Sequence, residues 1–285
     1  MFFMRANDCL ELAKRAFARS TIQDIFESGS SSERLIDIVD SSRYSGLKFD
    51  KVSELYTALF ELMKSDYRNE YVFKSALAQK IIKGRHKYVG ATFINELKIR
   101  ASVADTVIVN GTSSVYEIKT EFDSFFRLDS QLETYGRVFD KIYVVVSPDK
   151  VSSVFKYIPP GVGVLSLSKN FQLSEVIAAK SNKENVCQDY IFSILRKDEY
   201  CDVVLKKFGV LPNVAPIDMA EACSEIFRKI PAVEAHDYMV AQLRLRRSSY
   251  YDRAFLSQVP ASLLAAVMST NVSKPKLMRF AEVML

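Results

Sequence analysis

Hydrophobic residues recur at helical spacing near the start of the chain. Residues 5–18 place Leu10, Leu12, Ala13 and Phe17 near one helical face, and residues 51–64 repeat this pattern. Between them lies a run of serine and glycine, Ser28 to Ser32, whose composition predicts a loop. The first 65 residues or so are therefore predicted to form a small helical region.

The pattern changes after residue 88, where short apolar runs alternate with helical stretches. The Asn110-Gly111 pair separates two β-branched runs and is a strong hairpin signal. Strands are predicted at Ala91–Leu97, Val103–Val109, Val115–Thr120, Lys141–Ser147 and Gly161–Leu165, with helices over 127–139 and 149–157. The fold class that follows is α/β, a mixed sheet flanked by helices, with helical N- and C-terminal regions.

Helical periodicity returns from about residue 172. Gly209 follows a long amphipathic stretch and is a natural C-cap. Helices are predicted near 187–208, 217–229, 232–250, 259–268 and 274–284. The predicted organisation is an N-terminal helical region at 1–65, a core at 66–171 and a C-terminal helical region at 172–285.

Composition narrows the class of protein. The chain has 285 residues, 48% of them hydrophobic and 26% charged, as expected of a globular protein with a large core. Its four cysteines form no Cys-x-x-Cys pair, which favours free thiols over a zinc site. No segment reaches the ~18 apolar residues that span a bilayer, so a cytoplasmic protein without membrane contact is expected.

Two acids and a lysine in the central segment are candidate residues of a catalytic site. Side chains alternate along a strand, so Glu117 and Lys119 share a face and Ile118 points the other way. If the hairpin closes with a three-residue loop, residues whose numbers sum to 222 lie opposite each other. Asp105 then faces Glu117, about 5 Å away. A two-residue loop would give another register, and the sequence leaves both open.

Paired carboxylates on a sheet repel each other unless a cation lies between them. Mg²⁺ or Mn²⁺ prefers oxygen ligands of this kind, and a nearby lysine could orient an attacking water. These parts suit metal-assisted phosphodiester hydrolysis. The alternative is a solvated strand face, on which an acid-x-lysine pattern is common by chance.

The longer motif resembles PD-(D/E)XK nucleases, especially the RecB-like branch and the bacterial MmcB-like proteins. This resemblance implies that the mixed sheet is restriction-endonuclease-like. The resemblance covers about residues 90–147 and departs from the pattern at Ala104, where proline is usual. It rests on Ala104–Gly111, Tyr116–Ser124, Arg127–Tyr135 and Val138–Lys141.

This resemblance implies roles for individual residues. Asp105 and Glu117 would be metal ligands, with the Ile118 carbonyl as a third and Lys119 serving the attacking water. Gln131 and Tyr135 would hold the site or the DNA backbone. Glu96 would complete the metal set, with Glu70 as the second choice. On this interpretation Lys119→Ala should remove cleavage and leave the fold nearly intact.

Two basic runs are candidates for contact with phosphates. The first contains Lys83, Arg85 and Lys87, and the second contains Arg244, Arg246 and Arg247, followed by two tyrosines. A solvated helix face is the alternative for each. The net charge of +5 is compatible with nucleic-acid binding only where it is locally concentrated.

The sequence thus predicts a Mg²⁺- or Mn²⁺-dependent nuclease acting on nucleic acid, with DNA favoured, in repair, recombination or defence. The alternative is a non-catalytic nucleic-acid-binding or regulatory protein, since fold does not fix function. A protein partner bound through the C-terminal helices is a further expectation, and the oligomeric state is left open.

Overall fold

The chain forms two compact units, each built from segments that are distant in sequence. The computed structural model describes residues 6–83, 91–246, 251 and 253–285. Unit 1 comprises Met1–Val89, Leu167–Leu173 and Arg247–Leu285, and unit 2 comprises Gly90–Ser166 and Ser174–Arg246. The division into three consecutive regions stays a prediction. The compact units are interleaved along the chain, because residues 247–285 group with the N-terminal helices.

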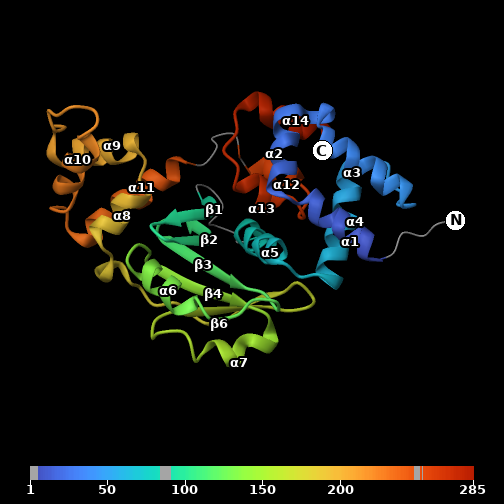
Figure 1. Ribbon diagram of the computed structural model, residues 1–285, viewed down its shortest axis with the longest axis horizontal. Coiled ribbons are helices and arrows are strands. Elements are labelled where there is room, and N and C mark those ends of the chain that lie inside the picture. The colour runs from blue at the N-terminus through green and yellow to red at the C-terminus, as the bar shows by residue number, and fades with distance from the viewer. Residues whose placement is uncertain (1–5, 84–90, 247–250, 252) are drawn as a thin grey trace. The chain divides into compact units, whose positions relative to one another are not determined.

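Unit 1 is helical. Its N-terminal helices, blue in Figure 1, pack against its C-terminal helices, which are red. Its helices are α1 (Ala6–Ala16), α2 (Arg19–Ser28), α3 (Glu33–Tyr44), α4 (Val52–Asp66), α5 (Glu70–Lys83), α12 (Arg253–Gln258), α13 (Leu264–Met268) and α14 (Lys274–Met284). Helix α14 packs on α2, where the rings of Phe26 and Phe280 stack at 4.5 Å. The predicted apolar face of the first helix is buried at Leu12, Ala13 and Phe17.

A short turn from the middle of the sequence also belongs to unit 1. The buried guanidinium of Arg68 donates to the carbonyl oxygens of Leu167 and Ser168, at 2.6 and 3.0 Å. The ring of Phe171 meets that of Phe60 edge-on, with centroids 5.7 Å apart. The turn between the last two strands is therefore fixed to the helices by both polar and aromatic contacts.

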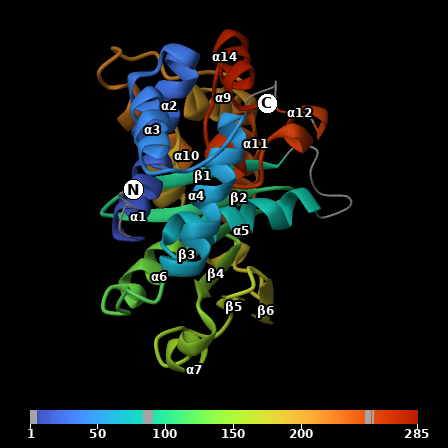
Figure 2. The ribbon, with the colours of Figure 1, turned by 90° about the vertical axis from the view of Figure 1, so that its right-hand side faces the viewer.

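Unit 2 contains an open six-stranded sheet whose strands follow one another in sequence order, as Figure 2 shows. The first three strands are antiparallel, and β3, β4 and β5 run parallel. The strands are β1 (Thr92–Ile99), β2 (Ser102–Val109), β3 (Ser113–Lys119), β4 (Lys141–Val146), β5 (Gly163–Leu167) and β6 (Leu173–Ile177).

Helices of unit 2 bury one hydrophobic cluster together with the sheet. Leu128, Leu132 and Tyr135 of α6 pack in the same cluster as Val107 and Val115 of the strands. Helices α8 and α11 pack on β1, and α11 also reaches β2. The helices are α6 (Leu128–Gly136), α7 (Val151–Val154), α8 (Gln188–Ile194), α9 (Lys197–Phe208), α10 (Met219–Phe227) and α11 (Ala232–Leu245).

The predicted fold class is confirmed as a mixed sheet flanked by helices, with helices at both ends of the chain. Four elements were not predicted: α2, α3, α12 and β6. Two of them bury few residues, since α3 buries only Leu35, Ile38 and Ser42, and β6 is largely exposed. The single helix predicted over 187–208 is two helices. The break comes at Arg196, whose backbone N–H donates to the Glu199 carboxylate at 2.7 Å.

Among the described residues, no helix combines the length and the apolar character needed to cross a membrane.

Candidate functional site

The hairpin of β2 and β3 has the register of a three-residue loop, one of the two alternatives that the sequence left open. Thr106 pairs with Tyr116, and Val109 pairs with Ser113, so paired residue numbers sum to 222. Gly111 in the loop has a φ of +75°, a conformation that favours glycine. The register therefore continues toward Asp105 and Glu117.

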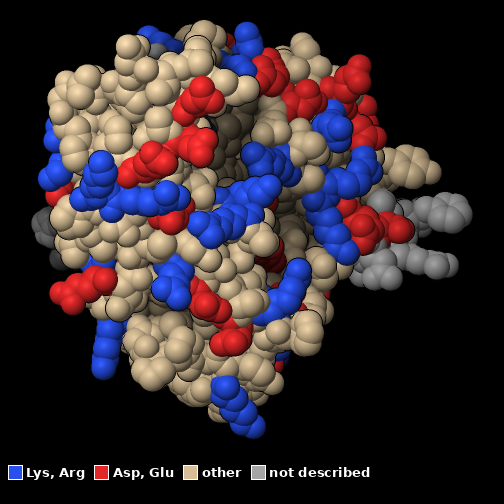
Figure 3. Space-filling model, turned by 60° about the vertical axis from the view of Figure 1, so that its left-hand side comes forward, with Lys and Arg blue, Asp and Glu red and all other residues tan. Residues whose placement is uncertain are grey.

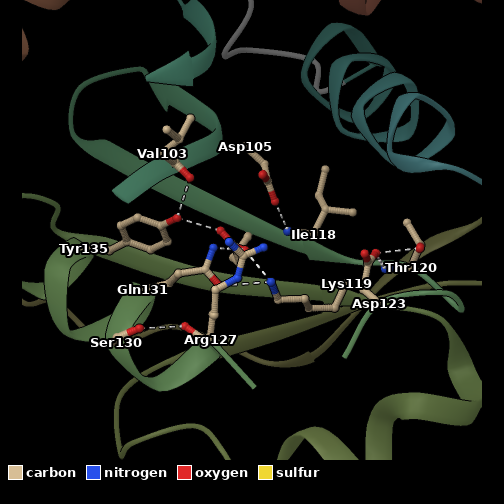
Figure 4. Close-up of polar contacts among 11 residues, drawn as sticks. Val103, Asp105, Ile118, Lys119, Thr120, Asp123, Arg127, Ser130, Gln131 and Tyr135 are labelled. Atoms are coloured by element: carbon tan, nitrogen blue, oxygen red, sulfur yellow. Dashed lines mark hydrogen bonds and ion pairs between the residues drawn. The ribbon is translucent and has the colours of Figure 1, made fainter. Parts of the chain in front are cut away.

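The Asp105 carboxylate replaces a backbone acceptor at the point where regular strand pairing stops. Its Oδ2 accepts a hydrogen bond from the backbone N–H of Ile118 at 2.7 Å, and Figure 4 shows this contact beside the other polar groups. The last regular pair of the two strands is Thr106 with Tyr116. Asp105 thus satisfies a backbone donor that would otherwise lack a partner at this end of the hairpin.

Glu117 lies at the centre of a buried polar network. Its side chain is 1% exposed, and its Oε1 accepts hydrogen bonds from Lys119 Nζ at 2.7 Å and Gln131 Nε2 at 2.6 Å. Its Oε2 accepts from the Tyr135 hydroxyl at 2.7 Å. The predicted sharing of a face by Glu117 and Lys119 is confirmed, and α6 covers that face through Gln131 and Tyr135.

The partners of Glu117 also contact one another or the backbone. Lys119 Nζ donates to Gln131 Oε1 at 3.0 Å, and the Tyr135 hydroxyl lies 2.9 Å from the carbonyl oxygen of Val103. Figure 4 shows these groups converging, with the Arg127 side chain extending toward them from the start of α6. Both oxygens of the carboxylate are therefore engaged, and the lysine neutralises its charge.

Tyr135 acts as a hydrogen-bond donor in this network. Burial and the negative charges of Glu117 and Asp105 raise the pKa of Tyr135 above its usual value. The phenol therefore keeps its proton at neutral pH, and the proton is available to the carboxylate. A buried carboxylate with one cation and two neutral donors is a stable internal arrangement.

The residues expected to complete a metal site do not assemble one. Glu96 lies on β1 opposite Asp105, at the one position where the pairing of β1 with β2 is interrupted, and its φ is +55°. Glu70 forms an ion pair with Lys74 at 2.6 Å in unit 1. Among the residues that the structure describes, no three His, Cys, Asp or Glu side chains are arranged to hold a metal ion. Binding of Mg²⁺ or Mn²⁺ at Asp105 and Glu117 stays a prediction.

The basic residues predicted to contact nucleic acid have different environments. Arg246 forms a two-pronged ion pair with Glu199, from Nε at 2.6 Å and Nη2 at 2.5 Å, with side chains only 10% and 13% exposed. Its Nη2 also donates to the carbonyl oxygen of Ile194 at 2.7 Å. Arg246 thus holds the end of α11 against α9, and its role as a phosphate contact stays a prediction. Arg244 is exposed.

The other predicted contacts cannot be placed at the level of side chains. Arg85, Lys87 and Arg247 lie outside the described residues, and Lys83 is described only as the last residue of α5.

A buried serine–histidine pair was missed by the sequence analysis. The Oγ of Ser113 lies 2.8 Å from Nε2 of His236, and both side chains are fully buried. Asp237 lies 3.3 Å from Nδ1 of the same ring. Burial lowers the pKa of His236 below its usual value, with Lys183 acting in the same direction. The pair joins β3 to α11, two elements too far apart in sequence for spacing to reveal the contact.

A second buried carboxylate fixes the corner before β4. Asp140 accepts hydrogen bonds from Thr112 Oγ1 at 2.7 Å, from the Ser181 hydroxyl and from the backbone N–H of Asn182 at 3.1 Å. Burial opposes ionisation, but these donors hold the pKa of Asp140 below its usual range. Asp140 therefore joins the hairpin loop to the segment after β6 and has a structural role.

The comparisons with known proteins identify the family. Residues 63–267 match the family model of bacteriophage P4 protein cII, so the chain belongs to this family. Protein cII of Enterobacteria phage P4 is 39% identical over 82 residues, which are 28% of this chain and 31% of that protein. The chain thus matches less than a third of the length of this relative.

A solved structure offers only a weak likeness. It is the SPO1766 protein of unknown function from Silicibacter pomeroyi, 19% identical, covering 32% of this chain and 62% of that chain with a TM-score of 0.27. A likeness of this size supports no conclusion about fold or function.

The resemblance to PD-(D/E)XK nucleases, of the RecB-like and MmcB-like kinds, was wrong as a family assignment. The matching phage family covers the whole of residues 90–147, on which that resemblance rested. Because that assignment was wrong, it no longer supports the description of the chain as a nuclease, a hydrolase and a metal-binding protein. The short acid-x-lysine motif is real, but its residues form an internal network.

Proposed function

We propose that this phage-family protein is a non-catalytic nucleic-acid-binding protein of a regulatory kind, and that unit 1 supplies the binding surface. The observation that carries the proposal is the uneven distribution of charge. Unit 1 contains 21 lysines and arginines against 14 aspartates and glutamates, whereas unit 2 contains 18 against 20. The net charge of +5 is thus concentrated in one unit, where it attracts phosphates.

The connection between α3 and α4 is the proposed contact within unit 1. Arg43, Lys48 and Lys51 are exposed there, and the Tyr44 side chain is 87% exposed. The guanidinium of Arg43 lies 5.6 Å from the centre of the Phe49 ring. Cations interleaved with aromatic rings can pair with phosphates and stack on bases. This segment has the chemistry that nucleic-acid binding requires.

The network around Glu117 supports the non-catalytic part of the proposal. Both carboxylate oxygens and the Lys119 ammonium are already engaged by neighbouring side chains. A catalytic lysine or metal ligand would have to leave these partners in a buried site, at a cost of several kcal/mol. Phosphodiester hydrolysis itself stays an untested prediction, so its measurement belongs to the same experiment.

The test is fluorescence anisotropy of labelled double-stranded DNA, single-stranded DNA and RNA with the full chain, between 50 and 200 mM salt. The test variant carries Arg43→Glu, Lys48→Glu and Lys51→Glu. The matched control carries Lys206→Glu and Lys207→Glu on α9 of unit 2. We expect the first variant to lose at least tenfold in affinity and to lower the salt slope on duplex DNA by up to about 3, since each lost phosphate contact contributes about 0.9.

The control should keep its affinity within about twofold. If no nucleic acid binds at 50 mM salt, the proposed binding is wrong. If binding is unchanged in the test variant, its assignment to this connection is wrong. Cleavage of any substrate in the presence of Mg²⁺ or Mn²⁺, with loss of cleavage in Glu117→Gln, would overturn the non-catalytic part.

A further inference from the structure

Two of the four cysteines lie side by side between neighbouring helices of unit 2. Helix α9 packs against α10, as Figure 1 shows, and the thiols of Cys201 on α9 and Cys223 on α10 form a hydrogen bond across this contact. Cys223 belongs to the buried hydrophobic cluster of unit 2, and Cys201 packs against the same cluster. Folding thus brings together two thiols that are distant in sequence.

Aromatic rings hold the two helices in this arrangement. The ring of Phe192 on α8 stacks on that of Tyr200 at 4.7 Å, and it meets the ring of Phe227 edge-on at 5.6 Å. Tyr200 precedes Cys201 on α9, and Phe227 lies one helical turn after Cys223 on α10. The contact of the thiols is therefore a fixed feature of the packed unit, and little chain entropy is lost when a bond forms between them.

The two sulfurs differ in their access to solvent. Cys223 is completely buried, and its burial together with the Cys201 contact raises the pKa of its thiol to about 11. Its Sγ also lies 3.6 Å from the Sδ of Met219. Cys201 is only half-buried, so a small solute reaches its sulfur first. Figure 3 brings the side with α9 and α10 forward and shows charged side chains of both signs scattered among uncharged areas, a surface that does not repel a neutral oxidant.

Exposure alone does not distinguish Cys201 from the other cysteines. Cys9 in unit 1 and Cys187 at the start of α8 are half-buried as well. Cys201 differs because a second thiol, that of Cys223, is in hydrogen-bonding contact with it. A sulfenic acid formed on one cysteine condenses with a neighbouring thiol to a disulfide. The pair is therefore a site for two-electron oxidation.

We propose that Cys201 and Cys223 form a redox-active dithiol that hydrogen peroxide converts to a disulfide. In the first step the Cys201 sulfur attacks one peroxide oxygen, the O–O bond breaks, and a sulfenic acid and one water are formed. In the second step the Cys223 sulfur attacks the Cys201 sulfur, and the S–O bond breaks. The oxygen leaves as a second water with the Cys223 proton. The two thiols thus lose two electrons, the peroxide is reduced to water, and α9 is joined to α10 covalently.

The test is a count of free thiols in the full chain before and after treatment with hydrogen peroxide. The protein is first reduced with dithiothreitol, then oxidised, denatured and alkylated with a maleimide, and its mass is measured intact and after peptide digestion. We expect the wild type to lose two of its four alkylatable thiols. The peptides should show one intrachain link, between Cys201 and Cys223, that dithiothreitol reverses.

Two variants separate the roles of the sulfurs. In Cys223→Ser the sulfenic acid of Cys201 has no thiol to condense with, so dimedone should label Cys201 about tenfold more strongly than in the wild type. Cys201→Ser should lose no pair of thiols, because the remaining Cys223 is buried. Cys187→Ser is the matched control: it removes another half-buried thiol and should still lose two. Circular dichroism shows whether each variant folds, and Cys223→Ala replaces Cys223→Ser if the buried hydroxyl prevents folding.

Retention of all four thiols by the wild type, at a peroxide concentration that oxidises free cysteine, would overturn the proposal. A disulfide that involves Cys9 or Cys187, or one that joins two chains, would overturn it too. The measurement involves no nucleic acid, so its outcome is independent of the proposed function.

Discussion

Lys119→Ala separates the two interpretations of the buried network. If Lys119 were a catalytic residue facing solvent, its removal would leave the fold nearly intact. In the structure, Lys119 is 8% exposed and its ammonium lies 2.7 Å from a Glu117 oxygen that is sealed from water. Removing the cation leaves the buried carboxylate without its ion-pair partner, although the hydrogen bonds from Gln131 and Tyr135 remain. We therefore expect Lys119→Ala to destabilise unit 2.

The size of this effect follows from the burial of the pair. Removing one partner of a buried ion pair typically costs about 3–5 kcal/mol, because the remaining charge is uncompensated. For a unit of roughly 150–250 residues, each kcal/mol lowers the melting temperature by about 2–4 °C. The expected fall for Lys119→Ala is thus about 6–20 °C. Glu117→Gln should lower the melting temperature less than Lys119→Ala does. The new amide can still form hydrogen bonds with its neighbours, and Lys119 retains its hydrogen bond to Gln131.

Far-UV circular dichroism is the suitable assay, because the chain contains no tryptophan. The double variant Lys119→Met with Glu117→Gln removes both charges and should be more stable than the sum of the single changes predicts. Lys206→Ala is the control: its ion pair is exposed, and the change should cost no more than about 1 kcal/mol. A melting temperature of Lys119→Ala within 2 °C of the wild type would refute the structural role of the pair.

Three further predictions concern the same unit. Arg246→Met should destabilise it by about 3 kcal/mol through the unpaired Glu199 and should leave nucleic-acid affinity unchanged; weaker binding by a fully folded variant would contradict this. The pKa of His236 is lowered by burial, so the unfolded chain takes up a proton first, and stability should fall as the pH drops below about 6.5. His236→Gln should flatten the melting temperature between pH 5 and 7, and an unchanged slope would exclude this residue as its cause. Gly163→Ala should cost about 1–3 kcal/mol, because its Cβ would lie 2.5 Å from the Tyr143 ring; urea unfolding measures it, and an equally stable variant would contradict the close approach.

The parts of the fold that depend on local chemistry were predictable from the sequence. Asn110-Gly111 predicted the hairpin, but the sequence left its register open, and the structure shows the register of the three-residue loop. The run Lys141–Val146 was recognisable as a buried strand because it is short and apolar, and Ile142, Val144, Val145 and Val146 are buried. Such features depend on the residues at a turn and on the two-residue alternation of a strand, and both can be identified in the sequence.

The role of the site was not predictable in the same way. The spacing of Glu117 and Lys119 is the same whether the strand face is open to water or covered by α6. Only the tertiary contact of Gln131 and Tyr135 with the carboxylate decides between these cases. A motif of three residues therefore identified the correct face of the sheet but not the internal network that its residues form with α6.

The environment of charged residues was not predictable from the sequence either, for single residues or for a whole unit. Arg244 and Arg246 are two residues apart on α11, which is about 200° around a helix, so one is exposed while the other is committed to Glu199. At the larger scale, the basic surplus of unit 1 arises because residues 1–89 and 247–285 fold together. No window along the sequence contains both segments, and their charges act on one partner only after folding brings them into one unit. The basic surplus of unit 1, on which the proposed function rests, is accordingly a property of the assembled unit, and the separate basic runs of the sequence do not reveal it.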